Sequence, residues 1–112
     1  MKRCTLLLVL LLCACGDKTP PAAAKAYAPP SDPALAKIFD TTCRTCHANP
    51  ASGAPQAGDT AAWSKRMAQG RDTLLTHTMS GFQSMPPMGL CMQCDEAQFT
   101  ALIEYMSGVK LP

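Results

Sequence analysis

The stretch Cys43-Arg44-Thr45-Cys46-His47 decides how the rest of this sequence is interpreted. It has the form C-x-x-C-H, the signature of covalent attachment of a c-type haem. Two thiols three positions apart can reach the two vinyl groups along one edge of a haem, and the adjacent imidazole can bind the iron. The stretch therefore predicts one covalent haem c, with Cys43 and Cys46 as the thioether cysteines and His47 as an iron ligand.

The first residues resemble a bacterial export signal. Met1-Lys2-Arg3 is followed by an apolar run over 6–12, which is too short to remain in a bilayer as a spanning helix. Ala14 precedes Cys15 as in a bacterial lipobox. We therefore expect residues 1–14 to be a lipoprotein signal peptide and Cys15 to be the lipidated first residue of the mature protein. The alternative is cleavage nearby without a lipid.

A spacer follows the expected anchor. Residues 17–33 hold five of the ten prolines and almost nothing large enough to bury, which is typical of a tether. We expect 15–33 to be the lipidated N-terminus and Pro/Ala-rich tether, and 34–112 to be the folded domain. This organisation predicts a membrane-anchored lipoprotein of the bacterial periplasm, and Gly16 directly after the anchor favours the outer membrane by analogy with known sorting signals.

The charge balance argues against one class of partner. The formal net charge is +2, and removal of residues 1–14 takes away Lys2 and Arg3, which brings the mature polypeptide to zero. Without a basic stripe there is no electrostatic reason to expect nucleic-acid binding. We therefore expect no nucleic-acid partner.

The sequence pattern of the domain predicts four helical segments separated by glycine and proline. Ser31 or Asp32 can cap the first, and the following three are expected to start at Asp59 or Thr60, at Asp72 and after Asp95. Nothing alternates as a strand does. We expect an all-α fold of about four helices wrapped around the haem, because so short a domain needs the buried macrocycle to complete its core. The residues expected to pack inside are Leu35, Ile38, Phe39, Thr42, Trp63, Met67, Leu74, Leu75, Thr78, Met79, Phe99, Leu102, Ile103, Tyr105 and Met106.

The sixth position of the iron has seven candidate ligands: Met67, Met79, Met85, Met88, Met92, Met106 and His77. Methionines on helix faces are best explained as core, and a lone helical histidine as solvated. Met85 differs, because it lies in the irregular run Ser84-Met85-Pro86-Pro87, where the prolines restrict the backbone to extended conformations. Met85 is our preferred axial ligand, and Met88 is the alternative.

These motifs together resemble a family, the class I cytochromes c of the bacterial cytochrome c5 type. The resemblance covers about 34–112 and rests on Cys43–His47, on the stretches 53–59 and 81–87, on Cys91-Met92-Gln93-Cys94 and on the closing 102–106. It implies that His47 and Met85 are the axial ligands, that Cys91 and Cys94 form a disulfide, and that the carbonyl of Pro55 accepts a hydrogen bond from the His47 ring.

The second cysteine pair, Cys91 and Cys94, can also be interpreted without the family resemblance. Asp95 follows Cys94, so this pair is not a second haem attachment site. In an exported protein two thiols so close are expected to oxidise to a disulfide, which would stabilise the start of the last helix. A redox-active dithiol is one alternative, and a zinc site made of all four thiolates is another, but the long gap between Cys46 and Cys91 disfavours zinc.

These predictions converge on electron transport without catalysis. If a thioether closes the sixth position, no substrate reaches the iron, and His/Met ligation raises the reduction potential in a way that suits a carrier. We expect a monohaem cytochrome that is not an enzyme and that moves single electrons between periplasmic or membrane-bound partners, such as a cytochrome complex and a terminal oxidase or reductase. The alternatives are a haem subunit or redox sensor of a larger complex, or a peroxidase-like enzyme if the sixth position is open.

Overall fold

The computed structural model of this chain describes residues 28–112. The expected signal peptide over 1–14, the expected lipid anchor at Cys15 and most of the tether lie outside the described residues.

The first helical stretch runs without a break from Pro33 to His47 and has three parts. These are α1 (Pro33–Ile38), a π-helical turn (Phe39–Cys43) and α2 (Arg44–His47). Asp32 caps it, since its carboxylate accepts from the backbone N–H of Ala34 at 2.7 Å. The stretch therefore delivers the haem motif at its carboxyl end.

Three further helices follow: α3 (Thr60–Met67), α4 (Arg71–Ser80) and α5 (Glu96–Ser107). Short 3₁₀ turns cover Pro50–Ser52 and Pro87–Leu90. Within residues 28–112 the extended pairing is limited to one isolated bridge between Phe82 and Met85. The predicted all-α architecture with four helical segments is confirmed.

The start of α4 differs from the prediction. Asp59 and Asp95 cap α3 and α5 as expected. However, α4 begins at Arg71 with Gly70 at the cap position, so Asp72 lies inside the first turn. Gly70 has φ of +85°, a conformation that glycine adopts easily. Asp72 still fits, because a carboxylate in the first turn interacts favourably with the positive end of the helix dipole.

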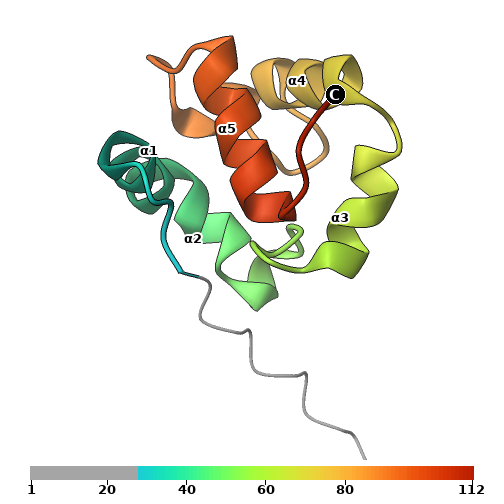
Figure 1. Ribbon diagram of the computed structural model, residues 1–112, viewed down its shortest axis with the longest axis horizontal. Coiled ribbons are helices and arrows are strands. Elements are labelled where there is room, and N and C mark those ends of the chain that lie inside the picture. Colours follow the sequence, from blue (N-terminus) through green and yellow to red (C-terminus); the bar gives the residue numbers. More distant parts are fainter. Residues whose placement is uncertain (1–27) are drawn as a thin grey trace, which may run out of the picture.

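Helix α5 is the centre of the fold. It contacts α1, α3 and α4, and Figure 1 shows it between α1 on one side and α3 and α4 on the other. Its inward strip consists of Phe99, Leu102, Ile103 and Met106, all buried. Most of the other core predictions also hold, and the buried members outside α5 include Phe39, Trp63, Leu74, Leu75 and Thr78.

One core prediction is wrong. Met79 is 44% exposed, although it was expected to pack inside. The inward face of α4 is already occupied by Leu74, Leu75 and Thr78. The next residue is turned by about 100° around the helix, which carries the side chain of Met79 toward solvent.

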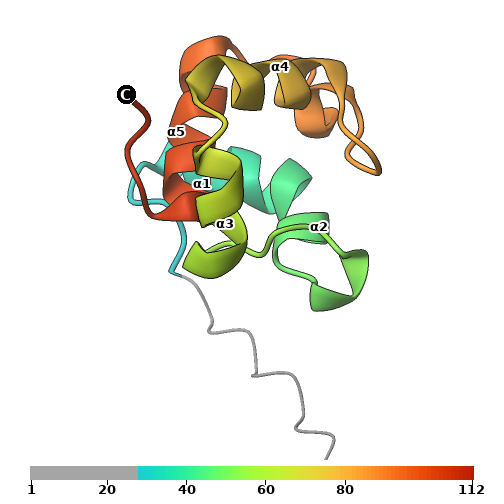
Figure 2. The same ribbon diagram turned by 90° about the vertical axis from the view of Figure 1, so that its right-hand side faces the viewer.

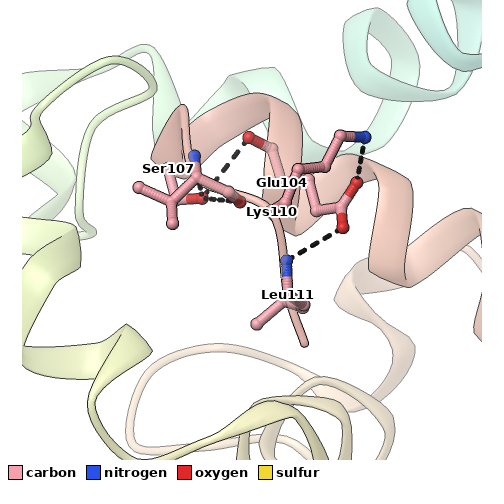
Figure 3. A network of polar contacts seen from close by, with 5 residues as sticks. Glu104, Ser107, Lys110 and Leu111 are labelled. Atoms are coloured by element: carbon pink, nitrogen blue, oxygen red, sulfur yellow. Dashed lines mark hydrogen bonds and ion pairs between the residues drawn. The ribbon is translucent and has the colours of Figure 1, made fainter.

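A polar network holds the end of α5 to the last residues of the chain (Figure 3). The carboxylate of Glu104 accepts from Lys110 Nζ at 2.6 Å and from the backbone N–H of Leu111 at 2.9 Å. The hydroxyl of Ser107 donates to the carbonyl of Val109 at 3.2 Å. The hydrogen bonds from Lys110 and Leu111 lower the pKa of Glu104 below its ordinary value of 4.5, against a small opposing effect of burial.

This network predicts a pH-dependent contribution to stability. The pKa of Glu104 is lower in the folded than in the unfolded chain, so the contribution is present above the unfolded value and is lost as the pH falls through the folded one. Glu104→Gln should lower the free energy of unfolding at pH 7 by roughly 0.2–1 kcal/mol, the range for exposed pairs. Urea denaturation at pH 7 and pH 3 checks this, and an equal effect at both pH values would contradict it.

Candidate functional site

The two cysteines of the C-x-x-C-H motif lie at the junction of the π-helical turn and α2. Cys43 is half-buried and Cys46 is exposed, and both thiols are free. Burial raises the pKa of the Cys43 thiol, while a contact with the Thr42 hydroxyl at 3.4 Å partly offsets this rise. Both residues line the same cavity as His47. The motif therefore presents two reachable thiols and one imidazole to a common space.

His47 is buried, and its ring is held by a hydrogen bond at Nδ1 and by packing against Trp63. The residue is 7% exposed, and Nδ1 donates to the carbonyl oxygen of Pro55 at 2.8 Å, the contact that the resemblance implied. The indole of Trp63 stacks beside it, with ring centroids 5.9 Å apart. Burial lowers the pKa of His47, the Pro55 carbonyl opposes this effect, and the charge of Arg66 adds to the lowering. A neutral ring protonated at Nδ1 leaves the lone pair of Nε2 available for a metal.

Hydrogen bonds from Gln56 hold the loop after His47. The sequence analysis did not single out this residue. Its side-chain amide donates to the carbonyls of Cys46, Asn49 and Ala54 at 3.1, 3.1 and 2.8 Å. Its own backbone carbonyl accepts from the Trp63 indole N–H at 2.9 Å. The Ala57 N–H also donates to the His47 carbonyl at 2.7 Å. No spacing rule in the sequence marks Gln56, because its partners are main-chain carbonyls.

The cavity encloses about 1300 Å³ of space not filled by protein atoms, part of which is open to solvent. The haem motif with Pro55 and the loop that follows α4 both contribute to its lining. In Figure 2 this loop descends on the side of the molecule where α2 lies. The apolar part of the lining includes the core residues Leu74, Phe99, Leu102, Ile103 and Met106.

Hydrogen bonds hold the backbone of the loop that contains Met85. Phe82 and Met85 exchange two main-chain hydrogen bonds of 3.0 and 2.9 Å. Gly81 precedes this pair with φ of +85°, and an added Cβ would lie 3.0 Å from the Met85 carbonyl oxygen. Only glycine fits there without a shift of the backbone. The methyl group of Met85 lies 3.3 Å from the place where a Cβ on Gly89 would stand.

The structure separates the seven candidates for the sixth ligand into two groups. Met85, Met88, Met106 and His77 line the cavity, whereas Met67, Met79 and Met92 do not. Met106 is 4% exposed and belongs to the core.

The expectation that His77 is solvated is wrong. Its ring is half-buried and stacks on Phe82, with centroids 4.0 Å apart. Two thioether side chains of the loop, Met85 and Met88, therefore remain as candidate ligands together with this imidazole, and all three line the cavity.

The residues that line the cavity fit a haem c. The two free thiols, the imidazole and thioether donors line one cavity. Its apolar lining suits a flat macrocycle, and the free Nε2 of His47 suits iron. The donor set therefore matches the covalent cofactor predicted from C-x-x-C-H.

The second cysteine pair forms a disulfide in the structure. Cys91 and Cys94 are joined just before α5, with their Cα atoms 5.4 Å apart and both residues buried. Over residues 28–112 no group of three or more His, Cys, Asp or Glu side chains is arranged to hold an ion. The described part of the chain thus offers no four-thiolate zinc site.

No helix among residues 28–112 has the length and apolar character needed to cross a bilayer.

Sequence comparison places the chain among small cytochromes. The profile of the family described as "Cytochrome C oxidase, cbb3-type, subunit III" matches residues 30–106. Cytochrome c5 of Ectopseudomonas mendocina is 39% identical over 74 residues, which cover 64% of this chain and 85% of that protein. Cytochrome c5 of Azotobacter vinelandii is 41% identical over 69 residues, covering 60% and 83%. Cytochrome c-555 of Chlorobaculum tepidum is 38% identical, covering 62% and 68%.

Solved structures agree with this relationship. A mono-haem ferrocytochrome c from Shewanella putrefaciens has a TM-score of 0.61 and 36% identity, covering 74% of this chain and all of that one. A chain in a crystal structure of an electron transfer complex of nitrite reductase with cytochrome c has a TM-score of 0.60 and 40% identity, covering 69% and 94%. The chain therefore belongs to the class I c-type cytochromes of the cytochrome c5 type, with one covalently bound haem c.

Proposed function

We propose that this protein carries single electrons between redox proteins at the periplasmic side of a bacterial membrane. The observation that carries the proposal is the cavity itself, which is lined by Cys43, Cys46 and His47 together with Met85. In this proposal Cys43 and Cys46 bind the haem through thioethers, and His47 and Met85 are the axial ligands. The electron transfer complex that contains a similar cytochrome supports redox proteins as the partners.

The bound haem supplies a one-electron couple between Fe(II) and Fe(III). The protein contributes a rigid and largely apolar surround. Pro55 holds the His47 ring through the Nδ1 hydrogen bond at 2.8 Å, and Trp63 packs against the same ring. The reciprocal hydrogen bonds of Phe82 and Met85 fix the opposite ligand. A site that changes little between the two oxidation states can exchange an electron without rearranging its side chains.

This geometry also argues against an enzyme. Met85 lines the cavity and comes from a loop held by two main-chain hydrogen bonds, so its thioether is available as the proposed sixth ligand. A peroxide or oxygen molecule would have to displace it.

Potentiometric titration of the full-length protein tests this function. We expect one reversible step that follows a one-electron Nernst curve, with the same spectrum in both directions. Hydrogen peroxide should not be consumed faster than by free buffer. Rapid peroxide turnover would contradict the proposed carrier and favour the peroxidase-like alternative.

We also propose that Cys15 carries a lipid and that 15–33 is the tether between membrane and domain. The lipobox-like run around Cys15 and the proline-rich composition support this proposal. A lipid anchor would concentrate the domain near membrane-bound donors and acceptors. Replacing Cys15 by alanine should move the protein from the membrane fraction to the soluble fraction of broken cells. An unchanged distribution would contradict the anchor, and separation of inner from outer membrane would test the preference for the outer one.

A role as a haem subunit of a larger complex is the second candidate. It is favoured by the match of residues 30–106 to a family described as a subunit of a cbb3-type oxidase. The aligned residues cover 85% and 83% of the two cytochromes c5, so those proteins are similar in size to this domain, which favours the single carrier. Size-exclusion chromatography of detergent-solubilised native membranes separates the candidates, because a subunit would elute with its partners.

A further inference from the structure

The loop between α4 and α5 contains an unusual run of backbone conformations. In the described part of the chain the non-glycine residues with positive φ are Gln83, Met88 and Leu90, at +54°, +59° and +66°, and all three lie in this loop. Gly89 has φ of +54°, so 88–90 are three consecutive residues with positive φ. A residue that carries a Cβ avoids this conformation, because the Cβ crowds the following carbonyl oxygen. The run 88–90, called here the left-handed turn, is therefore strained at two of its three positions.

The strain is not balanced within the turn itself. The side chain of Leu90 is 64% exposed, so little apolar surface is removed from water there. Two main-chain hydrogen bonds close the turn, from the Gly89 N–H to the Pro86 carbonyl at 3.0 Å and from the Cys91 N–H to the Met88 carbonyl at 2.9 Å. Each joins residues three positions apart, so neither connects the turn to the rest of the domain. The anchor of the turn must be a longer-range contact.

The Cys91–Cys94 disulfide connects the end of the turn to the core. Cys91 follows Leu90 directly, is 1% exposed and is bonded to Cys94, which is 6% exposed. Cys94 precedes Asp95, whose carboxylate accepts from the Gln98 N–H at 2.8 Å and caps α5. The disulfide therefore fixes the end of the left-handed turn relative to the start of α5, and so limits the relaxation of the turn.

The same turn contacts the proposed sixth ligand. The methyl group of Met85 lies 3.3 Å from the place where a Cβ on Gly89 would stand, so the main chain of the turn packs against the end of this side chain. All three residues of the turn line the cavity together with Met85. The hydrogen bonds between Phe82 and Met85 hold the Met85 backbone but do not involve its thioether. Restraint of the thioether itself comes from the left-handed turn.

We propose that the Cys91–Cys94 disulfide positions the axial ligand: it holds the left-handed turn in its strained conformation, and the turn holds the thioether of Met85 toward the iron. This inference rests on the axial role of Met85 in the proposed function. Without the disulfide the turn relaxes toward negative φ, the main chain at Gly89 moves away from Met85, and the thioether leaves the iron more often. The disulfide then acts on ligation as well as on stability.

The test measures how fast carbon monoxide binds to two reduced, haem-loaded, full-length proteins, the unmodified one and the double variant Cys91→Ala/Cys94→Ala. Carbon monoxide needs the position that the thioether occupies, so its binding rate reports how often Met85 is away from the iron. We expect binding to be about tenfold faster in the double variant, which corresponds to the strain of one left-handed residue. The reduction potential should also fall, because the thioether favours Fe(II). Unchanged values of both quantities would overturn the proposal.

Leu90 offers a matched pair of variants. Leu90→Gly removes the strain at this position, whereas Leu90→Ala also shortens the side chain but keeps the Cβ that causes the strain. When each is added to the double cysteine variant, Leu90→Gly should return the carbon monoxide rate part of the way to that of the unmodified protein, and Leu90→Ala should not. Equal rates in these two proteins would overturn the proposal.

A general loss of stability is the competing explanation and has its own control. Urea brings the unmodified protein to the free energy of unfolding of the double variant, and the carbon monoxide rate is then measured at that urea concentration. We expect slow binding, because the disulfide still holds the turn. Binding as fast as in the double variant would overturn the proposal, since any destabilisation would then open the site.

The protein with its disulfide intact keeps the proposal testable even if the double variant does not mature. In that protein Leu90→Gly should unfold at a higher denaturant concentration than Leu90→Ala, because φ of +66° is unfavourable for alanine only. Equal midpoints would show an unstrained turn and would overturn the proposal. Failure of the proposed function gives a different result: the unmodified protein would bind carbon monoxide as fast as Met85→Ala does.

Discussion

Met85→Ala should lower the reduction potential and allow carbon monoxide to bind the ferrous protein. A thioether stabilises Fe(II) relative to Fe(III), and water or hydroxide in its place reverses that preference. We expect the equilibrium between the two oxidation states to move at least tenfold toward Fe(III), which for one electron is about 59 mV. Spectroelectrochemistry gives the potential, and the visible spectrum under carbon monoxide reports the open position.

Met88→Ala is the control for this experiment. Met88 lines the same cavity and is also half-buried, but it follows the loop residues that the Phe82–Met85 hydrogen bonds fix. Its backbone has φ of +59°, which alanine must adopt as methionine does, so the strain is the same in both proteins. We expect that carbon monoxide does not bind to the ferrous Met88→Ala protein. If Met88→Ala alone opened the site, Met88 and not Met85 would be the ligand.

Replacing both Cys43 and Cys46 by alanine should abolish covalent attachment of the haem. The cavity would then have to hold the macrocycle by apolar contact and by His47 alone, and the small core would lose a component that it needs. We expect little folded, coloured protein, and whatever pigment is bound should pass into acidic acetone. The extraction compares the colour of the precipitated polypeptide with that of the solvent.

The second cysteine pair provides the matched control. Cys91 and Cys94 have the same spacing, and their replacement by alanine removes only a disulfide that closes a four-residue ring. In the chain-entropy model this ring contributes about 2 kcal/mol to stability. The double variant should keep its haem through acid extraction while unfolding at a lower denaturant concentration. Loss of haem from this variant and not from the first would reverse the roles of the two pairs.

Local chemistry in the sequence was sufficient to predict where three of the four helical segments begin. Asp32, Asp59 and Asp95 are strong cap residues, and the structure uses all three. The start of α4 was missed because Gly70 caps it through its backbone conformation, without a side chain that could be recognised in the sequence.

The π-helical turn over Phe39–Cys43 was also not predicted. Thr41 and Thr42 donate their hydroxyls back to the carbonyls of Lys37 and Ile38, each at 2.8 Å, and such bonds bend helices. Threonine also occurs in ordinary α-helices, so Thr41 and Thr42 alone did not indicate a π-helical turn. The turn lies directly before α2 and ends at Cys43, the first residue of the haem motif.

The site was predictable where it depends on chemistry and less so where it depends on packing. C-x-x-C-H and the methionine before two prolines pointed to residues that the structure brings to one cavity. The entry of His77 into that cavity depends on its stack with Phe82, and the role of Gln56 depends on three main-chain carbonyls. Neither tertiary contact leaves a pattern in the sequence.

The most direct test of the account is the visible absorption spectrum of the reduced full-length protein, matured in a host that attaches c-type haem, before and after exposure to carbon monoxide. We predict a coloured protein whose ferrous spectrum does not change, because in the proposed site His47 and Met85 would be the two axial ligands of the iron. A colourless protein, or a spectrum that changes as soon as carbon monoxide is added, would contradict the account.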